Sequence, residues 1–429
     1  MNADELILVS VDDHIAEPAD MFERHVPAKY RGDAPRVVED EHGIQQWWYG
    51  SIMGRNLGLN AVAGKPREMY DLDATRYEEM RPGCYDVHER VRDMSAGGYL
   101  AALNFPNWTG FSGQVLSQGP DPKLNQIMIQ AYNDWHVLEW CGAYPDRFIP
   151  CGLVPLFDPH MAASEVRRLA RLGCHAVAFS ENPEALGCPS IHSGAWDPFF
   201  AACSDTGTVI CLHLGSSSRP IDMSSDAPVS VAPSLSGART INTLMELLWS
   251  SLWHRFPDLR FALSEGDIGW IPYFLLRAQH VQEVQSGWTM HEFPKGMGPI
   301  EIFQRHFLAC FIEDTVGLRL LDFFNLDNVS WESDYPHSDS MWPNAPEQLA
   351  EQLEGLPRST IDKITYQNAL RHYQFDPFRT RSMDQCTVAA LRAEAADVDT
   401  VTHVGRATGD RERKLEEFRS RFRSAEAGR

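Results

Sequence analysis

The chain has 429 residues, 43% of them hydrophobic, so it can form one large α/β domain of about 250–350 residues with additions, or two smaller domains. The formal net charge of −21 argues against nucleic acid as a partner, because phosphate binding needs a basic surface. No apolar run approaches the roughly 18 residues of a membrane span, and residues 1–10 lack a signal-peptide pattern. We therefore expect a cytoplasmic protein with no membrane contact.

The nine cysteines of the chain include no CxxC pair, so we expect them to be small core residues.

Short apolar runs rich in β-forming residues alternate along the chain with amphipathic stretches. The eight strand candidates are residues 6–12, 99–105, 148–154, 175–180, 208–214, 258–264, 306–312 and 328–333. The helical candidates are residues 160–173, 196–207, 241–256, 267–284 and 316–325. Strands that are apolar on both faces and separated by helices form parallel sheets, and eight such units close a barrel. The pattern predicts an α/β fold, a (β/α)8 TIM barrel. A doubly wound open sheet is the alternative, but no Gly-rich fingerprint follows the first strand.

Two segments lie outside this repeat. Residues 28–95 form an insertion after the first strand, and the stretch RVVEDEHGIQQWWY predicts a hairpin that turns near His42–Gly43. The repeat stops near residue 375. We therefore expect a catalytic domain at 1–375 and a helical extension at 376–429, whose charged end at 410–429 packs on the domain or contacts another subunit.

Histidines and acids gather where the predicted strands end. The candidates are Asp12, His14 and Glu17 after the first strand, Glu181 and Asn182 after the fourth, His213 after the fifth, Glu265 after the sixth, and Asp334 and His337 after the eighth. The carboxyl ends of barrel strands meet on one face, so these side chains are expected to converge. Converging imidazoles and carboxylates lose hydration and repel one another unless a cation lies among them. The pattern therefore predicts a metal site.

The candidates differ in the role we expect for them. The expected metal ligands are Asp12, His14, Glu181, His213, Glu265 and Asp334. Three residues are expected to hold the ligands in place: Glu17, Asn182 and His337. Two of them have an alternative role, because Glu17 could cap the next helix and His337 could itself be a metal ligand. Asp13 points the other way along the strand and is expected to be solvated or bonded to backbone, and His175, at a strand start, to be structural.

The motifs VDDHIAEP, HLGSS, SEGDIGWIP and ESDYPHSD, in this order between about residues 7 and 375, resemble the amidohydrolase superfamily. The resemblance is to its amidohydrolase-related branch, which includes metal-dependent decarboxylases. The family pattern has His-x-His after the first strand, a His after the fifth, a His after the sixth and an Asp after the eighth. His14, His213 and Asp334 match that pattern, whereas Asp12 and Glu265 stand where histidines are usual.

Both departures replace an imidazole by a carboxylate. Harder ligands suit iron or manganese over zinc, and six expected ligands exceed the three that one catalytic zinc needs. We therefore expect a dinuclear iron centre, alone or mixed with manganese or zinc, with a single zinc as the alternative. In this respect the sequence is similar to a small group of non-haem diiron monooxygenases within the branch.

Three functions follow from these expectations. The first is an iron-dependent monooxygenase that uses O2 to hydroxylate a small organic or amino acid substrate, with Glu181 or Glu265 bridging the metals and His337 orienting Asp334 or relaying protons. The second is a redox-neutral decarboxylase or hydrolase, with Asp334 as general base and Glu265 in place of the missing histidine. The third is a catalytically silent subunit that keeps a structural metal beside a homologous partner. The insertion and the charged tail favour a homo-oligomer or hetero-oligomer.

Overall fold

Nine parallel strand segments form two sheets in the computed structural model, which describes residues 1–54, 57–70 and 74–401. The first sheet has the order β1-β5-β6, and the second has the order β7-β8-β9-β10-β11-β12. Their bounds are β1 Val9–Ile15, β5 Ala101–Pro106, β6 Phe148–Ile149, β7 Gly152–Leu153, β8 Ala176–Ser180, β9 Val209–His213, β10 Arg260–Ser264, β11 Phe307–Phe311 and β12 Val329–Trp331.

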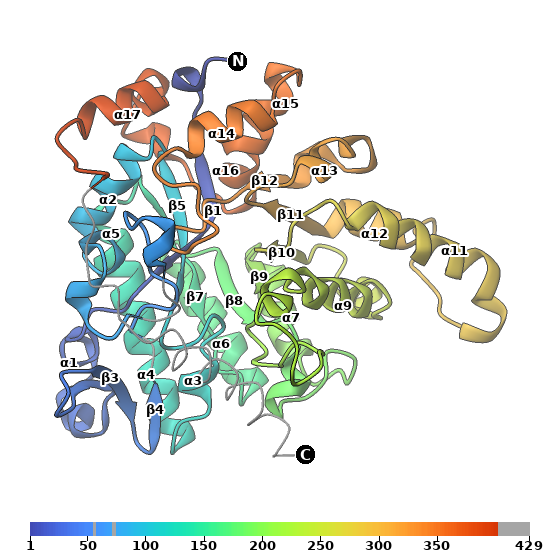
Figure 1. Cartoon of the computed structure of the whole chain (residues 1–429). Helices are drawn as coiled ribbons and strands as arrows, with labels where there is room; N and C mark the ends of the chain where they lie inside the picture. The colour runs from blue at the N-terminus through green and yellow to red at the C-terminus, as the bar shows by residue number, and fades with distance from the viewer. Residues whose placement is uncertain (55–56, 71–73, 402–429) are drawn as a thin grey trace.

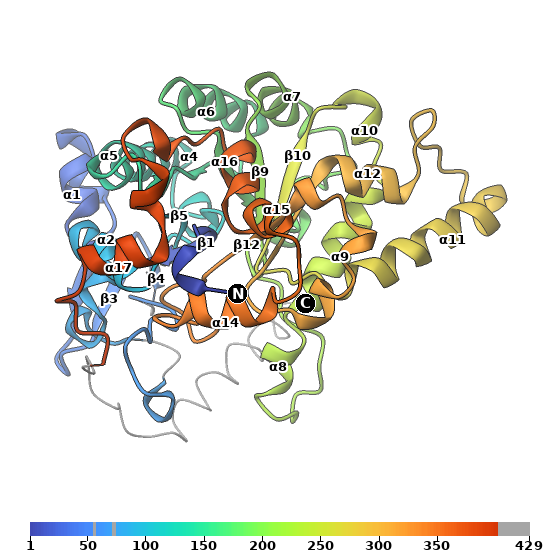
Figure 2. The ribbon, with the colours of Figure 1, turned by 90° about the horizontal axis from the view of Figure 1, so that it is seen from above.

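The two sheets follow one another around a barrel, which confirms the predicted fold class. β6 and β7 are separated by only two residues and are the two halves of the strand expected at 148–154. At the other junction, the Asp334 amide donates to the Asp12 carbonyl over 2.8 Å and the His14 amide to the Tyr335 carbonyl over 2.6 Å. Figures 1 and 2 show the strands in the centre with helices around them.

Apolar burial explains why these segments pair. Every residue of β8 and β9 is buried, as expected for strands of a parallel sheet covered on both faces. The neighbouring helices α6 and α7 begin with proline in their first turn, and the Asp158 carboxylate caps α6 by accepting hydrogen bonds from two backbone amides. These two helices thus start where the sequence provides a start signal.

Helices cover the outside of the barrel. Their bounds are α1 Met21–His25, α2 Val87–Ala96, α3 Gln114–Ser117, α4 Pro122–Asp134, α5 Cys141–Ala143, α6 Pro159–Arg171, α7 Asp197–Thr206, α8 Val231–Ser234, α9 Gly237–Leu248, α10 Leu252–Arg255, α11 Ile271–Thr289, α12 Pro299–His306, α13 Thr315–Leu318, α14 Ala345–Gln352, α15 Arg358–Asp362, α16 Asn368–His372 and α17 Val388–Glu394. The predictions at 160–173, 196–207 and 267–284 correspond to α6, α7 and α11.

Two helix predictions were wrong in extent. The stretch 241–256 is two helices, α9 and α10, because the Ser250 hydroxyl accepts a hydrogen bond from the Leu252 amide and starts a second helix. The stretch 316–325 holds only the single turn α13, followed by a 3-10 turn at Leu321–Phe323.

The inserted segment folds into a small antiparallel sheet of β2 Arg36–Glu39, β3 Gln45–Tyr49 and β4 Ile52–Gly54. The predicted hairpin is confirmed, since the Asp40 carboxylate accepts hydrogen bonds from the His42 and Ile44 amides and fixes the turn. The third strand was not predicted. Trp47 of β3 is buried and stacks on Trp108, 4.9 Å away between ring centroids, so the small sheet packs on the loop that follows β5.

Beyond residue 375 the chain continues as two 3-10 turns and α17, which packs on α2 and on the N-terminal 3-10 turn. The charged helix predicted at 410–429 lies outside the described residues. No helix in the described ranges is long and apolar enough to cross a membrane.

Candidate metal centre

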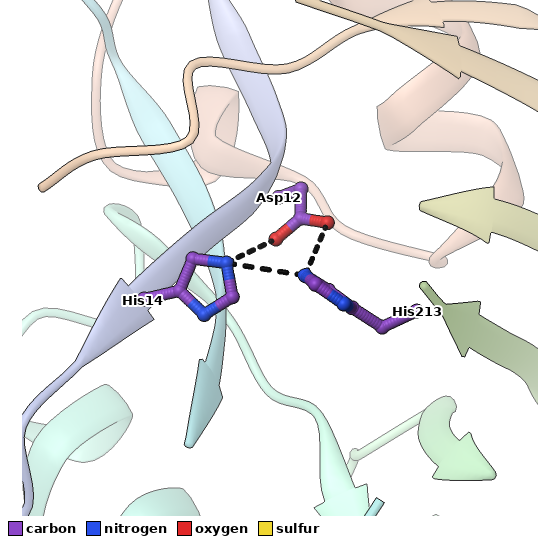
Figure 3. A group of neighbouring side chains, drawn as sticks. All are labelled: Asp12, His14 and His213. Carbon is purple, nitrogen blue, oxygen red and sulfur yellow. Dashed lines mark hydrogen bonds and ion pairs between the residues drawn. The ribbon is translucent and has the colours of Figure 1, made fainter. Parts of the chain in front are cut away.

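Asp12, His14 and His213 form the centre of the site (Figure 3). Asp12 and His14 lie two residues apart on β1, and His213 is the last residue of β9. His14 Nε2 lies 3.4 Å from Asp12 Oδ1, and His213 Nε2 lies 3.4 Å from Asp12 Oδ2. The two imidazoles approach to 3.2 Å between their Nε2 atoms. The three side chains therefore point at one another from two strand ends that are distant in sequence.

Asp334 and His337, which follow β12, complete this group. Asp334 Oδ1 lies 3.2 Å from His14 Nε2 and 2.8 Å from His337 Nδ1. The His337 ring stacks on that of His14, with 3.9 Å between centroids. This places His337 where it can hold Asp334 in position, the role expected from the sequence, although its atoms are also close enough to serve as a ligand.

Glu265 reaches the site from the end of β10. Its Oε2 lies 3.3 Å from His213 Nε2, and its side chain keeps 18% exposure whereas those of Asp12 and Asp334 are fully buried. A further group of close carboxylates consists of Glu265, Asp334 and Asp339. Glu265 and Asp334 have positive φ angles of 55° and 58°, a conformation that costs non-glycine residues energy and occurs most often at functional sites.

The donor set fits a divalent cation. All four carboxylate oxygens of Asp12 and Asp334 are buried and accept no hydrogen bond from a backbone amide or hydroxyl of the described residues, and their polar neighbours are imidazole nitrogens. The Nδ1 atom of His213 lies 2.6 Å from the Leu214 carbonyl, so this nitrogen carries the proton and the Nε2 lone pair is free to ligate. Buried carboxylates without donors are unfavourable unless a cation compensates them.

A family model described as Amidohydrolase matches residues 23–375. The chain belongs to the amidohydrolase family. The superfamily expected from its motifs is therefore confirmed.

Solved structures agree with this assignment at the level of the fold. An amidohydrolase from Mycobacterium avium subsp. paratuberculosis K-10 is 19% identical, with a TM-score of 0.66 over 86% of this chain and 99% of the other. The 5-carboxyvanillate decarboxylase of Sphingomonas paucimobilis is 19% identical, with a TM-score of 0.59 over 86% and 100%. The 5-carboxyvanillate decarboxylase of Novosphingobium aromaticivorans, in complex with manganese and 4-hydroxy-3-methoxy-5-nitrobenzoic acid, is 19% identical, with a TM-score of 0.60 over 87% and 99%.

Burial and mutual repulsion set the charge states in the site of this amidohydrolase. Burial raises the pKa of Asp12 well above its ordinary value, and the nearby carboxylates of Glu332 and Asp334 raise it further. Burial also lowers the pKa of His213 to about 4 and, together with His337, lowers that of His14. For Asp334, burial acts to raise the pKa, but His337 and His14 outweigh it and hold the pKa below its ordinary value. Both histidines are thus neutral at pH 7, as metal ligation requires.

Three predicted residues lie outside these close groups. Glu181 Oε1 accepts hydrogen bonds from the Ser217 hydroxyl and the Gly215 amide, so it fixes the loop after β9, and its ligand role stays a prediction. Glu17 accepts from the Trp108 and Thr109 amides and orders the loop after β5. Asn182 caps a 3-10 turn through the Ala185 amide. Glu17 and Asn182 therefore support loops at the mouth of the barrel.

The expectation that Asp13 is solvated or tied to backbone was wrong. Asp13 is fully buried and accepts hydrogen bonds from the side chains of Ser10 (2.9 Å) and Tyr99 (3.3 Å), with Arg90 Nη1 3.6 Å away. Arg90, from α2, also donates to the carbonyls of Gly83 and His14. Sequence reasoning missed Arg90, because its helix lies in the inserted segment and nothing local links it to the first strand.

Proposed function

We propose that this amidohydrolase is a divalent-metal decarboxylase of a small carboxylic acid. The observation that carries the proposal is the convergence of Asp12, His14, His213 and Asp334, whose four buried carboxylate oxygens have no backbone amide or hydroxyl donor among the described residues. The fold is shared with decarboxylases, one of them solved with manganese and a nitrobenzoic acid. These neighbours favour the decarboxylase alternative over the monooxygenase that we placed first from the sequence.

Two imidazoles and two carboxylates form a ligand set that suits manganese or iron. A divalent ion held there supplies positive charge that binds and polarises an oxygen-bearing substrate group. The rings of Phe111 and Phe105 line the same place, since Phe111 lies 4.1 Å and Phe105 4.9 Å from His213 between centroids. A carboxylic acid with a flat, apolar ring could pack against the rings of Phe105 and Phe111 while its carboxylate faces the ion.

Glu265 is the residue placed to transfer a proton. In the metal-free protein, burial raises the pKa of Glu265 well above the ordinary value and the charge of Asp334 raises it further, so the site favours the protonated carboxyl group. When the bond between the substrate carbon and its carboxylate breaks, CO2 leaves and the electron pair stays on that carbon. The Glu265 proton then forms the new C–H bond, and the partial exposure of Glu265 allows water to return the proton.

A dinuclear oxygenase is the second candidate, because one observation favours it. The group Glu265, Asp334 and Asp339 adjoins the group His14, Asp334 and His337, and the two share Asp334. A pair of cations bridged by a carboxylate needs more ligands than a single cation does. A mononuclear decarboxylase does not need the additional carboxylates.

Turnover with and without oxygen separates the two candidates. The protein, loaded with manganese or with iron, is incubated with a panel of hydroxybenzoic acids under strict anaerobic conditions and in air, and CO2 release and O2 consumption are recorded. CO2 release of equal rate in both conditions supports the decarboxylase. Product formation that requires O2 and two irons per chain contradicts it and supports the oxygenase.

A further inference from the structure

Arg239 lies in the first turn of α9, between the loops that follow β9 and β10. On one side this turn packs on Gly266, the residue after Glu265, because Thr240 Cγ2 lies 3.0 Å from the point where a Cβ on Gly266 would be. On the other side, Arg239 Nη1 lies 3.1 Å from the corresponding point on Gly215, in the loop after β9. The guanidinium is therefore placed at the end of the barrel where the candidate metal ligands gather.

The guanidinium of Arg239 has hydrogen-bonding capacity that the described residues do not use. Its Nη2 donates to the Arg219 carbonyl, whereas its Nε is buried and has no hydrogen-bond partner among them. Arg239 forms no ion pair with a carboxylate within residues 1–54, 57–70 and 74–401. An arginine stays charged at neutral pH, and its planar fork of N–H donors fits a carboxylate. A half-buried cation without an anion is unfavourable, so an anion from outside the chain would stabilise it.

The neighbouring acids do not compensate this cation fully. Burial lowers the pKa of Arg239 below its ordinary value, and the charges of Glu181 and Glu265 oppose this effect only in part. Oε1 of Glu181 already accepts hydrogen bonds from the loop after β9. An apolar wall lies next to the cation, because Cε2 of Phe111 is 3.8 Å from the same point on Gly215 that Arg239 approaches. The guanidinium thus adjoins the ring that we assign to substrate packing.

We propose that Arg239 binds a second acid group of the substrate, so that the preferred substrates are dicarboxylic acids with a flat ring. The proposal rests on the proposed function, in which one carboxylate of the substrate faces the divalent ion. The ring then packs on Phe111 and the second carboxylate pairs with the guanidinium. Two anionic groups on one ring match the two cationic centres, the ion and Arg239. A substrate analogue with only one charge leaves Arg239 unpaired, and a site disfavours analogues that leave its polar groups unpaired.

Equilibrium binding tests the proposal without depending on turnover. Isothermal titration calorimetry of the manganese-loaded full chain compares phthalic, isophthalic and terephthalic acids with their monoamides, which have nearly the same shape but one negative charge fewer. We expect at least one diacid to bind about tenfold or more tightly than its monoamide. Arg239→Gln is expected to reduce this preference to about twofold or less and to leave the affinity for the monoamide unchanged. Arg171→Gln is the matched control, because Arg171 is the exposed last residue of α6, and it is expected to keep the preference.

A wild-type chain that prefers none of the three diacids overturns the proposal, and this comparison decides the matter even if Arg239→Gln fails to fold, as judged by circular dichroism. A preference that Arg239→Gln retains also overturns it. Arg239→Lys keeps the charge but not the planar fork, so it is expected to keep part of the preference.

The CO2 assay described above separates this proposal from the proposed function. CO2 release together with a diacid preference that does not depend on Arg239 refutes the role of Arg239 and leaves the decarboxylase. A preference that depends on Arg239, without CO2 release from any acid, refutes the decarboxylase and supports Arg239 as the residue that binds the second acid group.

Discussion

His14 and His213 stand 199 residues apart in the chain, yet their Nε2 atoms are 3.2 Å apart at the centre of the barrel mouth. Each of these nitrogens also lies 3.4 Å from a carboxylate oxygen of Asp12. Two lone pairs and two carboxylates directed at one point are the arrangement of ligands around a cation.

Replacing either histidine by alanine is therefore expected to remove the cation. His213→Ala is expected to lower metal occupancy at least about tenfold and to abolish turnover, because the variant lacks an imidazole whose Nε2 lone pair faces the cation. Elemental analysis after dialysis measures the occupancy. His175→Ala serves as the control: His175 precedes β8 and its Nδ1 lies 3.2 Å from the Thr206 carbonyl, so this variant is expected to keep its metal.

Glu265→Gln separates ligation from proton transfer. If Glu265 delivers the proton, the variant keeps its metal and loses about 10²-fold or more in kcat, since glutamine cannot donate and regain a proton. Substrate turnover and metal content are measured on the same preparation. A variant that loses its metal in parallel with its activity shows that Glu265 is a ligand and contradicts the role proposed here.

The metal-free protein is expected to lose stability as the pH rises. Burial, together with neighbouring carboxylates, raises the folded-state pKa of Asp12, Glu265 and Glu332 above their ordinary values. Above about pH 6.5 His14 and His213 are neutral in both states, so at these carboxyl groups the native state binds more protons than the unfolded state, and stability falls as the pH rises through the raised values. Thermal unfolding of the metal-free protein at a series of pH values from neutral pH upward measures the effect.

Asp12→Asn provides the control for this pH dependence. The amide removes one buried charge from the cluster, so the metal-free variant is expected to be more stable at pH 8 than the metal-free wild type, with a shallower slope against pH. The same variant should gain less stability from added metal, because one ligand oxygen is weakened. An unchanged slope would falsify the assignment of the pH dependence to this cluster.

Arg90 is expected to be needed for stability. Its guanidinium holds Asp13 and the backbone carbonyl of His14, and all of these groups are buried. Arg90→Gln leaves the Asp13 carboxylate without its cation and is expected to cost about 3–5 kcal/mol in the free energy of unfolding. In the double variant Asp13→Asn/Arg90→Gln, part of that loss should be recovered, because neither position then carries a buried charge. Urea denaturation of the three variants measures the coupling, and additive losses would argue against it.

The sequence was most informative where a residue's neighbours along the chain determine its place. Asp12 and His14 lie on β1, His213 ends β9 and Asp334 follows β12. The carboxyl ends of parallel barrel strands meet on one face, so the convergence of these residues could be inferred without coordinates. The hairpin around Asp40 was predictable for the same reason, since its turn is built from local hydrogen bonds.

Contacts between distant elements could not be inferred in this way. Asp13 was misjudged because its burial depends on Tyr99 and on Arg90, which approach from later elements. Glu181 follows a strand end as predicted, but whether its carboxylate faces the candidate metal centre or the next loop depends on Ser217, 36 residues further on. Periodicity likewise gives no sign that the outer half of α11 leaves the barrel.

The central claim is that the side chains at the barrel mouth bind a divalent cation, and metal content per chain tests it most directly. The wild type and His213→Ala are expressed in medium supplemented with manganese and iron, dialysed, and analysed for metals, with protein measured by amino acid analysis. We predict about one divalent ion per wild-type chain and almost none in the variant. Wild-type protein that keeps no divalent metal, or a variant that keeps as much as the wild type, contradicts the account.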